Sequence, residues 1–112
     1  MHKNHLYKGS LTHIILYMLE NNGEMYGYEI SKRAKELTSG DLDITEGALY
    51  PTLHKLEAQG FLRSRIRNIG NRNRKYYQIT PKGGKEGKLK LAELKEYVQN
   101  LHQFLNLQLR KE

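Results

Sequence analysis

An apolar seam near the C-terminus constrains the possible folds of this chain more than any other feature. Its side chains recur at spacings of three, four, three and four residues, at Leu91, Leu94, Val98, Leu101 and Leu105. This is the seam of a helix that packs along another helix, as in a coiled coil. Tyr97 and Phe104 widen it, and we expect a terminal helix of about 28 residues.

The rest of the chain is too small to bury so long a seam. With 112 residues in all, the sequence has room for one small domain beside this helix. We therefore expect the helix to pair with a second copy of the chain and form a homodimer. The alternative is that it packs back onto the first helix of its own chain.

Composition excludes several classes of protein. The chain has no cysteine, which excludes disulfide frameworks and zinc fingers. Its longest apolar run, Ile14–Leu19, is far shorter than the roughly 20 residues that cross a bilayer. The first residues do not read as a signal peptide. We expect a soluble, cytoplasmic chain with no membrane partner.

The sequence carries no sign of catalysis or of a cofactor. The five histidines are scattered, and no carboxylate is spaced to complete a metal site. No nucleophile–base pair is evident, and Gly83-Gly84 lacks the strand–loop–lysine context of a phosphate-binding loop. We predict a protein that is not an enzyme and that binds no metal and no cofactor.

Positive charge is concentrated in one segment. The formal net charge is +7, and residues 60–80 hold no acidic side chain but six basic ones, namely Arg63, Arg65, Arg67, Arg72, Arg74 and Lys75. Such a run is typical of a surface that follows phosphates. The alternative is a solvated strand face whose charge serves no partner.

Two helices are predicted in the first third of the chain. The first begins at Leu11 with Ser10 as its N-cap, and residues 21–23 (Asn-Asn-Gly) end it. The second covers about Tyr26–Leu37. The spacing of its apolar residues predicts that it buries Ile30, Ala34 and Leu37.

A third helix begins near Thr45, its N-cap, and Gly60 ends it. It turns three leucines inward, Leu49, Leu53 and Leu56. Pro51 is its sixth residue, where proline costs a helix about 3 kcal/mol. A kink, or a late start after Gly47, would accommodate this proline.

The basic segment itself predicts a β-hairpin. Leu62–Ile69 is the first strand, residues 70–74 (Gly-Asn-Arg-Asn-Arg) form the turn, and Lys75–Thr80 is the second strand. Pro81 is then the first residue of the last helix, with Thr80 as its N-cap.

The order of these elements predicts a mainly α (α+β) winged helix-turn-helix with a long C-terminal dimerisation helix. Residues 1–80 would be the DNA-binding domain and residues 81–112 the dimerisation helix. A helix fits the major groove, where each base pair shows a distinct pattern of donors and acceptors. The arginines of a neighbouring hairpin can contact the backbone or the minor groove.

Four sequence blocks carry a resemblance to a known family. They are YGYEI at 26–30, GALYPTL at 47–53, LEAQGFL at 56–62 and RKYYQIT at 74–80. They resemble PadR-type transcriptional regulators, in particular the small subfamily in which one terminal helix replaces a larger second domain. The resemblance implies a homodimeric DNA-binding repressor whose terminal helices help to form the dimer. Some relatives release DNA when they bind aromatic or drug-like compounds.

The candidate DNA contacts come from the third helix and the hairpin. They are Thr45, Tyr50, Thr52, His54, Lys55, Asn71, Arg72, Asn73, Arg74 and Lys75. Tyr50 matches the family tyrosine and is the best single candidate, with packing against Pro51 and the hairpin as the alternative. Because the third helix offers no Arg, Asn or Gln for bidentate base contacts, we expect modest sequence selectivity. Arg63, Arg65 and Arg67 are secondary candidates, or they pair with Glu57 or Glu46.

Two further functions stay open at this stage. Tyr97, Leu101 and Phe104 are candidates for an apolar ligand slot at the dimer interface, although aromatic residues at helical spacing more often belong to a plain core. A winged helix that binds another protein and never DNA is the alternative function. The hairpin argues against it, since a protein-binding surface usually mixes charges.

Overall fold

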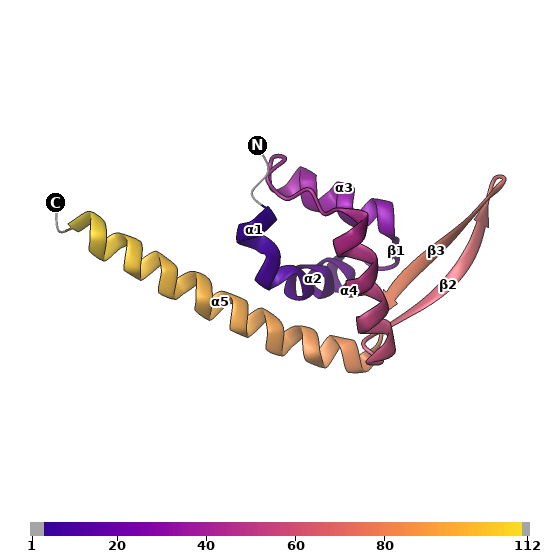
Figure 1. Ribbon diagram of the computed structural model, residues 1–112. Helices are drawn as coiled ribbons and strands as arrows, with labels where there is room; N and C mark the ends of the chain where they lie inside the picture. The colour runs from indigo at the N-terminus through magenta and orange to yellow at the C-terminus, as the bar shows by residue number, and fades with distance from the viewer. Residues whose placement is uncertain (1–3, 111–112) are drawn as a thin grey trace.

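The structure is a computed structural model that describes the backbone of residues 4–110 and the side chains of residues 4–106. The predicted order of elements is confirmed (Figure 1): α1 (Asn4–Tyr7), the 3-10 helix η1 (Lys8–Ser10), α2 (Leu11–Asn22), β1 (Met25–Tyr26), α3 (Gly27–Leu37), α4 (Glu46–Ala58), β2 (Leu62–Ile69), β3 (Arg72–Ile79) and α5 (Pro81–Arg110). This is a winged helix-turn-helix followed by a long helix. The hairpin β2–β3 is the wing.

The hydrophobic core lies where α2, α3 and α4 meet one face of the sheet. Ile15, Ile30, Leu53 and Tyr77 are almost completely enclosed there. The predicted burial of Leu37 is wrong, because its side chain is 62% exposed. It lines an open groove between α3 and α5 that a single chain does not fill.

The wing is longer and its turn shorter than predicted. β2 and β3 pair antiparallel from Leu62↔Ile79 to Ile69↔Arg72, so the turn is only Gly70-Asn71, and Gly70 takes a positive φ of 63°. The residues predicted as turn, 72–74, are strand. Residues 72–74 pair with residues 67–69 across the hairpin. This pairing outweighs the weak strand propensity of Asn73.

A third strand, β1, was not predicted. Met25 and Tyr26 pair with Tyr77 and Tyr76 of β3, which gives the sheet order β1-β3-β2. Two residues are too few to show any period in a sequence. The strand matters for the site because it brings Glu24 beside the wing.

Helix α4 runs from Glu46 through Pro51 to Ala58 without a break, so the late start after Gly47 is wrong. Thr45 holds the N-cap position, and its carbonyl accepts from Leu49 N–H at 2.9 Å. Its hydroxyl makes no capping hydrogen bond. Gly60 ends the helix at a φ of 82°, as predicted.

The N-terminal residues form helical turns that were not predicted. Asn4 attaches these turns to the segment before α4 through two hydrogen bonds with the backbone of Asp43. Its Nδ2 donates to the Asp43 carbonyl at 2.8 Å, and its Oδ1 accepts from Asp43 N–H at 2.9 Å. Ser10 holds the N-cap position of α2, as predicted, but its side chain makes no capping hydrogen bond. The hydroxyl of Ser10 donates backwards to the carbonyl of Tyr7 instead.

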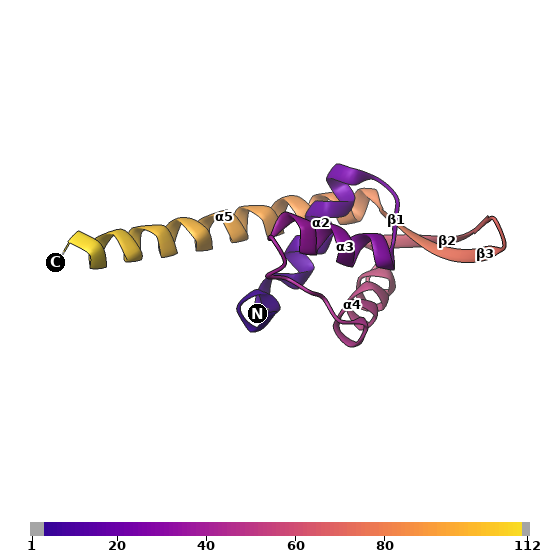
Figure 2. The same ribbon diagram turned by 90° about the horizontal axis from the view of Figure 1, so that it is seen from above.

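Helix α5 begins as predicted and then leaves the core. Thr80 caps it, accepting from Gly83 N–H at 3.0 Å. Its first half lies along α2, where His13 Nε2 is 3.0 Å from a Glu93 oxygen. Figure 2 shows that α5 and the wing extend from the helical core in opposite directions. Over residues 4–110, no helix has the length and apolarity to cross a bilayer.

Candidate nucleic-acid interface

Helix α4 presents most of its predicted contact residues to solvent. His54 and Lys55 are exposed on the side opposite the three buried leucines, while Thr45 is exposed at the start of the helix, beside Ala48. Thr52 is only half-buried, but its hydroxyl already donates to the carbonyl of Ala48 at 2.8 Å. The exposed face therefore offers a histidine and a lysine to a ligand, and the N-cap adds a threonine hydroxyl that makes no capping hydrogen bond.

Tyr50 has a second role inside the protein. Its ring lies against Gly27, the first residue of α3, where an added Cβ would sit only 2.8 Å from the Cζ atom of the ring. Because Gly27 has no side chain, α4 and α3 can approach closely here. The ring lies 6.4 Å from that of His54 and keeps 36% of its surface exposed, so Tyr50 fixes the helix pair and still faces outward.

The ladder of the wing sorts its basic residues onto two faces. Cross-strand partners share a face, and the pairs Arg63↔Gln78, Arg65↔Tyr76, Arg67↔Arg74 and Ile69↔Arg72 place all five arginines together. The other face carries Lys75 and turns toward α4, since Ser64 on that face bonds Glu57. Asn71 lies in the turn and Asn73 on the Lys75 face.

The basic run is free of acids in sequence but not in space. Glu24 accepts from Arg65 Nε at 2.6 Å and from an Arg67 guanidinium nitrogen at 3.3 Å. The hydrogen bond from Arg65 lowers the pKa of the Glu24 carboxyl below its ordinary value of 4.5, outweighing the effect of burial. The alternative in which these arginines pair with Glu57 or Glu46 is wrong, because Arg65 and Arg67 pair with Glu24, which β1 brings onto their face.

Tyrosines cover much of the remaining arginine face. Arg67 lies 4.7 Å over the Tyr76 ring and Arg74 lies 4.5 Å over the Tyr26 ring, while the two rings pack edge to face at 5.3 Å. Cation–π contacts of this kind hold a guanidinium in place. Arg74 is therefore half-buried, whereas Arg72 near the turn is exposed and has no ionic partner among the described residues.

The predicted seam of α5 lies open in the second half of the helix. Val98, Leu101 and Leu105 are 55%, 42% and 57% exposed, and Leu91 and Leu94 are half-buried nearer the core. Beside them runs an apolar groove of about 690 Å³ between α5 and helices α1–α3. Tyr97 and Leu101 line it, but Phe104, predicted to share the slot, does not.

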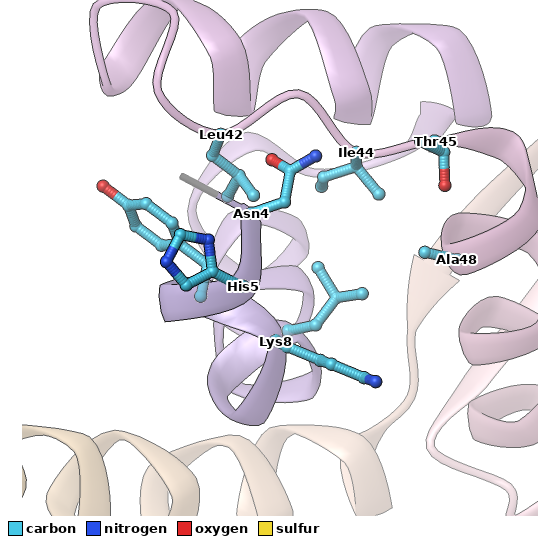
Figure 3. A pocket seen from close by; sticks show the side chains of 9 residues that line it. Asn4, His5, Lys8, Leu42, Ile44, Thr45 and Ala48 are labelled. Atoms are coloured by element: carbon cyan, nitrogen blue, oxygen red, sulfur yellow. The ribbon is translucent and has the colours of Figure 1, made fainter. Parts of the chain in front are cut away.

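A smaller pocket, of about 190 Å³, lies behind the start of α4. Figure 3 shows that it is formed by α1, the segment that leads to Thr45, and the first turn of α4. Its walls are mainly apolar, with Leu42, Ile44 and Ala48 on the side of α4. Within residues 4–110, no cluster of three or more histidine and carboxylate side chains is placed to hold a metal ion.

Comparisons with known proteins identify relatives of the chain. Residues 15–89 match the model of the "Transcriptional regulator PadR-like family". A transcriptional regulator of Mycobacterium tuberculosis is 38% identical over 71 residues, which is 63% of this chain and 62% of the relative, so the match spans less than two thirds of that protein.

Solved structures share the fold over most of the chain. A transcriptional regulator from Clostridium thermocellum superposes with a TM-score of 0.79 at 34% identity, over 89% of this chain and 97% of that one. Bacillus subtilis PadR in complex with operator DNA superposes with a TM-score of 0.65 at 32% identity, over 72% of this chain and 46% of that one. The family resemblance noted in the sequence is thus confirmed, and the chain belongs to the PadR-like family of transcriptional regulators.

Proposed function

We propose that this chain binds operator DNA as a homodimer in the cytoplasm and represses transcription. The observation that carries the proposal is the placing of the exposed α4 face beside an arginine-rich wing on one small domain. The similar PadR of Bacillus subtilis has been seen on operator DNA. In our proposal α4 enters the major groove and the wing follows the adjacent backbone or minor groove.

The side chains of α4 suggest how the sequence would be read. A helix of this kind fits the groove, but bidentate base contacts come from Arg, Asn or Gln. The exposed positions hold Thr45, Tyr50, His54 and Lys55 instead. We therefore propose that Lys55 contacts a phosphate, that His54 and Tyr50 read bases, and that DNA shape supplies part of the selectivity.

The open seam of α5 supports the dimer. An apolar stripe of this length in a small protein needs a covering surface, and a second α5 is self-complementary under twofold symmetry. Residues 1–80 and residues 81–112 then act as the DNA-binding and dimerisation parts. Two copies of α4 would read a pseudo-palindrome whose half-sites lie about one or two helical turns apart.

Fluorescence anisotropy against the DNA upstream of the gene, at several salt concentrations, tests the proposal. Replacing Arg72 and Arg74 by alanine should weaken binding to all sequences and lower the salt slope by about two. Lys88→Ala, an exposed cation on α5, is the matched control and should leave the slope unchanged. Weak binding of the wild type even at low salt would favour a protein-binding winged helix.

The groove beside α5 favours a second candidate property, control by a small molecule. Its walls are apolar and include Tyr97 and Leu101, which suits a flat aromatic or drug-like effector. A compound screen that follows both the melting temperature and the anisotropy of bound DNA tests this. An effector should raise the melting temperature and release the DNA, whereas a compound that does only the first is no effector.

A further inference from the structure

Glu57, in the last turn of α4, contacts both strands of the wing. One of its carboxylate oxygens accepts from the hydroxyl of Ser64 in β2 at 2.5 Å, and the other lies 3.6 Å from Nζ of Lys75 in β3. These two residues are diagonal neighbours in the ladder, because Ser64 pairs with Tyr77 and Lys75 with Ile66. A single carboxylate on α4 thus spans the hairpin.

Glu24 contacts the opposite face of the same hairpin. Its two oxygens accept from Arg65 at 2.6 and 3.0 Å, which is the bidentate geometry that fixes both position and orientation. It also accepts from Arg67. Because Glu24 directly precedes β1 and α3, this contact joins the wing to the helix that packs against α4.

Neither contact reaches the last two residue pairs of the wing, because Arg67 and Lys75 are the outermost residues that the two carboxylates contact. Beyond the pair Arg67↔Arg74, the hairpin extends into solvent as residues 68–73. An isolated two-stranded hairpin is only marginally stable and twists more strongly than a larger sheet. The backbone ladder therefore does not by itself fix the angle between the end of the wing and α4, whereas carboxylates on both faces restrain it.

We propose that Glu24 and Glu57 are positioning residues that hold the wing at the angle to α4 that a DNA duplex requires. Arg65, Arg67 and Lys75 then serve inside the protein, and Arg72 and Arg74 are left to contact phosphates. This inference rests on the proposed DNA binding. In this proposal Lys75 has a different role from Arg72 and Arg74, although all three were predicted as DNA contacts from the sequence.

Neutralising either carboxylate distinguishes a positioning role from an effect of net charge on DNA binding. Glu57→Gln and Glu24→Gln each raise the net charge by one, so on charge alone they should tighten DNA binding. If the carboxylates position the wing, both variants bind about three- to tenfold more weakly, because the wing loses its preset angle. The matched control is Glu46→Gln, which removes an exposed carboxylate of α4 that forms no ion pair with the wing among the described residues. This control should bind about twofold more tightly.

The salt dependence of DNA binding tests whether Lys75 contacts a phosphate or only Glu57. Arg72→Ala should lower the salt slope by about one, while Lys75→Met should weaken binding with the slope unchanged. Exchanging the pair, with Glu57→Lys and Lys75→Glu together, restores the contact at constant net charge. The exchanged protein should recover binding to within about twofold of the wild type, as pairs coupled in this way do.

Amide hydrogen exchange in the free protein gives a readout without DNA. Exposed ion pairs add little to global stability, so Glu57→Gln and Glu24→Gln should fold and show faster exchange confined to β2 and β3. If both instead bind DNA more tightly, as Glu46→Gln does, and exchange is unchanged, the inference is wrong. If exchange rises in a protein that binds no duplex at any salt, the positioning holds and the proposed function fails.

Discussion

Gly83, at the start of α5, is the glycine whose replacement the structure predicts to be most damaging. A Cβ added there would collide with the carbonyl oxygen of Phe61 and lie 2.8 Å from both Phe61 C and Ile79 Cγ1. Ordinary contacts of a Cβ begin near 3.4 Å. Because two of these neighbours are backbone atoms, α5 itself would have to move away from the root of the wing.

The cost follows from what that movement breaks. Thr80 N–H donates to Phe61 O at 3.0 Å and the Thr80 hydroxyl donates to Gly60 O at 2.6 Å, and each bond contributes about 1 kcal/mol. Overpacking adds about 1–3 kcal/mol, while alanine gains about 1 kcal/mol over glycine in a helix. We expect Gly83→Ala to destabilise the protein by about 2–4 kcal/mol.

Urea denaturation at fixed protein concentration measures this cost, with Gly84→Ala as the control. A Cβ added at Gly84 would make only an ordinary contact, with Glu20 Oε2 at 3.8 Å. That variant should therefore be as stable as the wild type or up to about 1 kcal/mol more stable. A Gly83→Ala protein that unfolds at the same urea concentration as Gly84→Ala would refute the reasoning.

Three further outcomes are expected. Leu53→Ala, at a fully buried site, should cost about 2–5 kcal/mol in urea denaturation, whereas Leu89→Ala, 67% exposed, should change stability by less than about 0.5 kcal/mol. Leu101→Glu should convert the proposed dimer to a monomer in sedimentation, because it places a charge in the seam, and a dimer that persists would place the interface elsewhere. The pKa of the Glu24 carboxyl is lowered in the folded protein. The stabilisation that its contacts with Arg65 and Arg67 give the wing is therefore present above pH 4.5 and is lost as the pH falls through the folded pKa. The protection of the wing amides, measured relative to their intrinsic exchange rates, should therefore fall only at acidic pH, and Glu24→Gln should remove that dependence.

The sequence predicted those elements whose signal is local and periodic. The leucine stripe of α4 and the stop at Gly60 placed that helix within one residue, and Thr80-Pro81 placed the start of α5. The period of a helix, its caps and a positive φ are each determined by a few neighbouring residues. The order of elements and the family blocks then defined the fold.

Contacts between distant segments were beyond reach of the sequence alone. No local pattern indicates that Met25-Tyr26 adds a third strand, and for that reason the Glu24 partner of Arg65 and Arg67 was missed. Counting charges along the chain showed residues 60–80 as free of acids, while the fold brings two carboxylates to them. The length of the wing was also underestimated, because strand pairing overrides the turn propensity of Asn73.

The most direct test of the account is the number of chains that bind one operator duplex. Sedimentation velocity with a labelled operator fragment measures it, alongside the free protein at the same concentration. We expect the free protein to sediment as a dimer and the complex to hold two chains on a single duplex. A complex with one chain per duplex, or a protein that stays monomeric and never shifts the labelled DNA at low salt, would contradict the account.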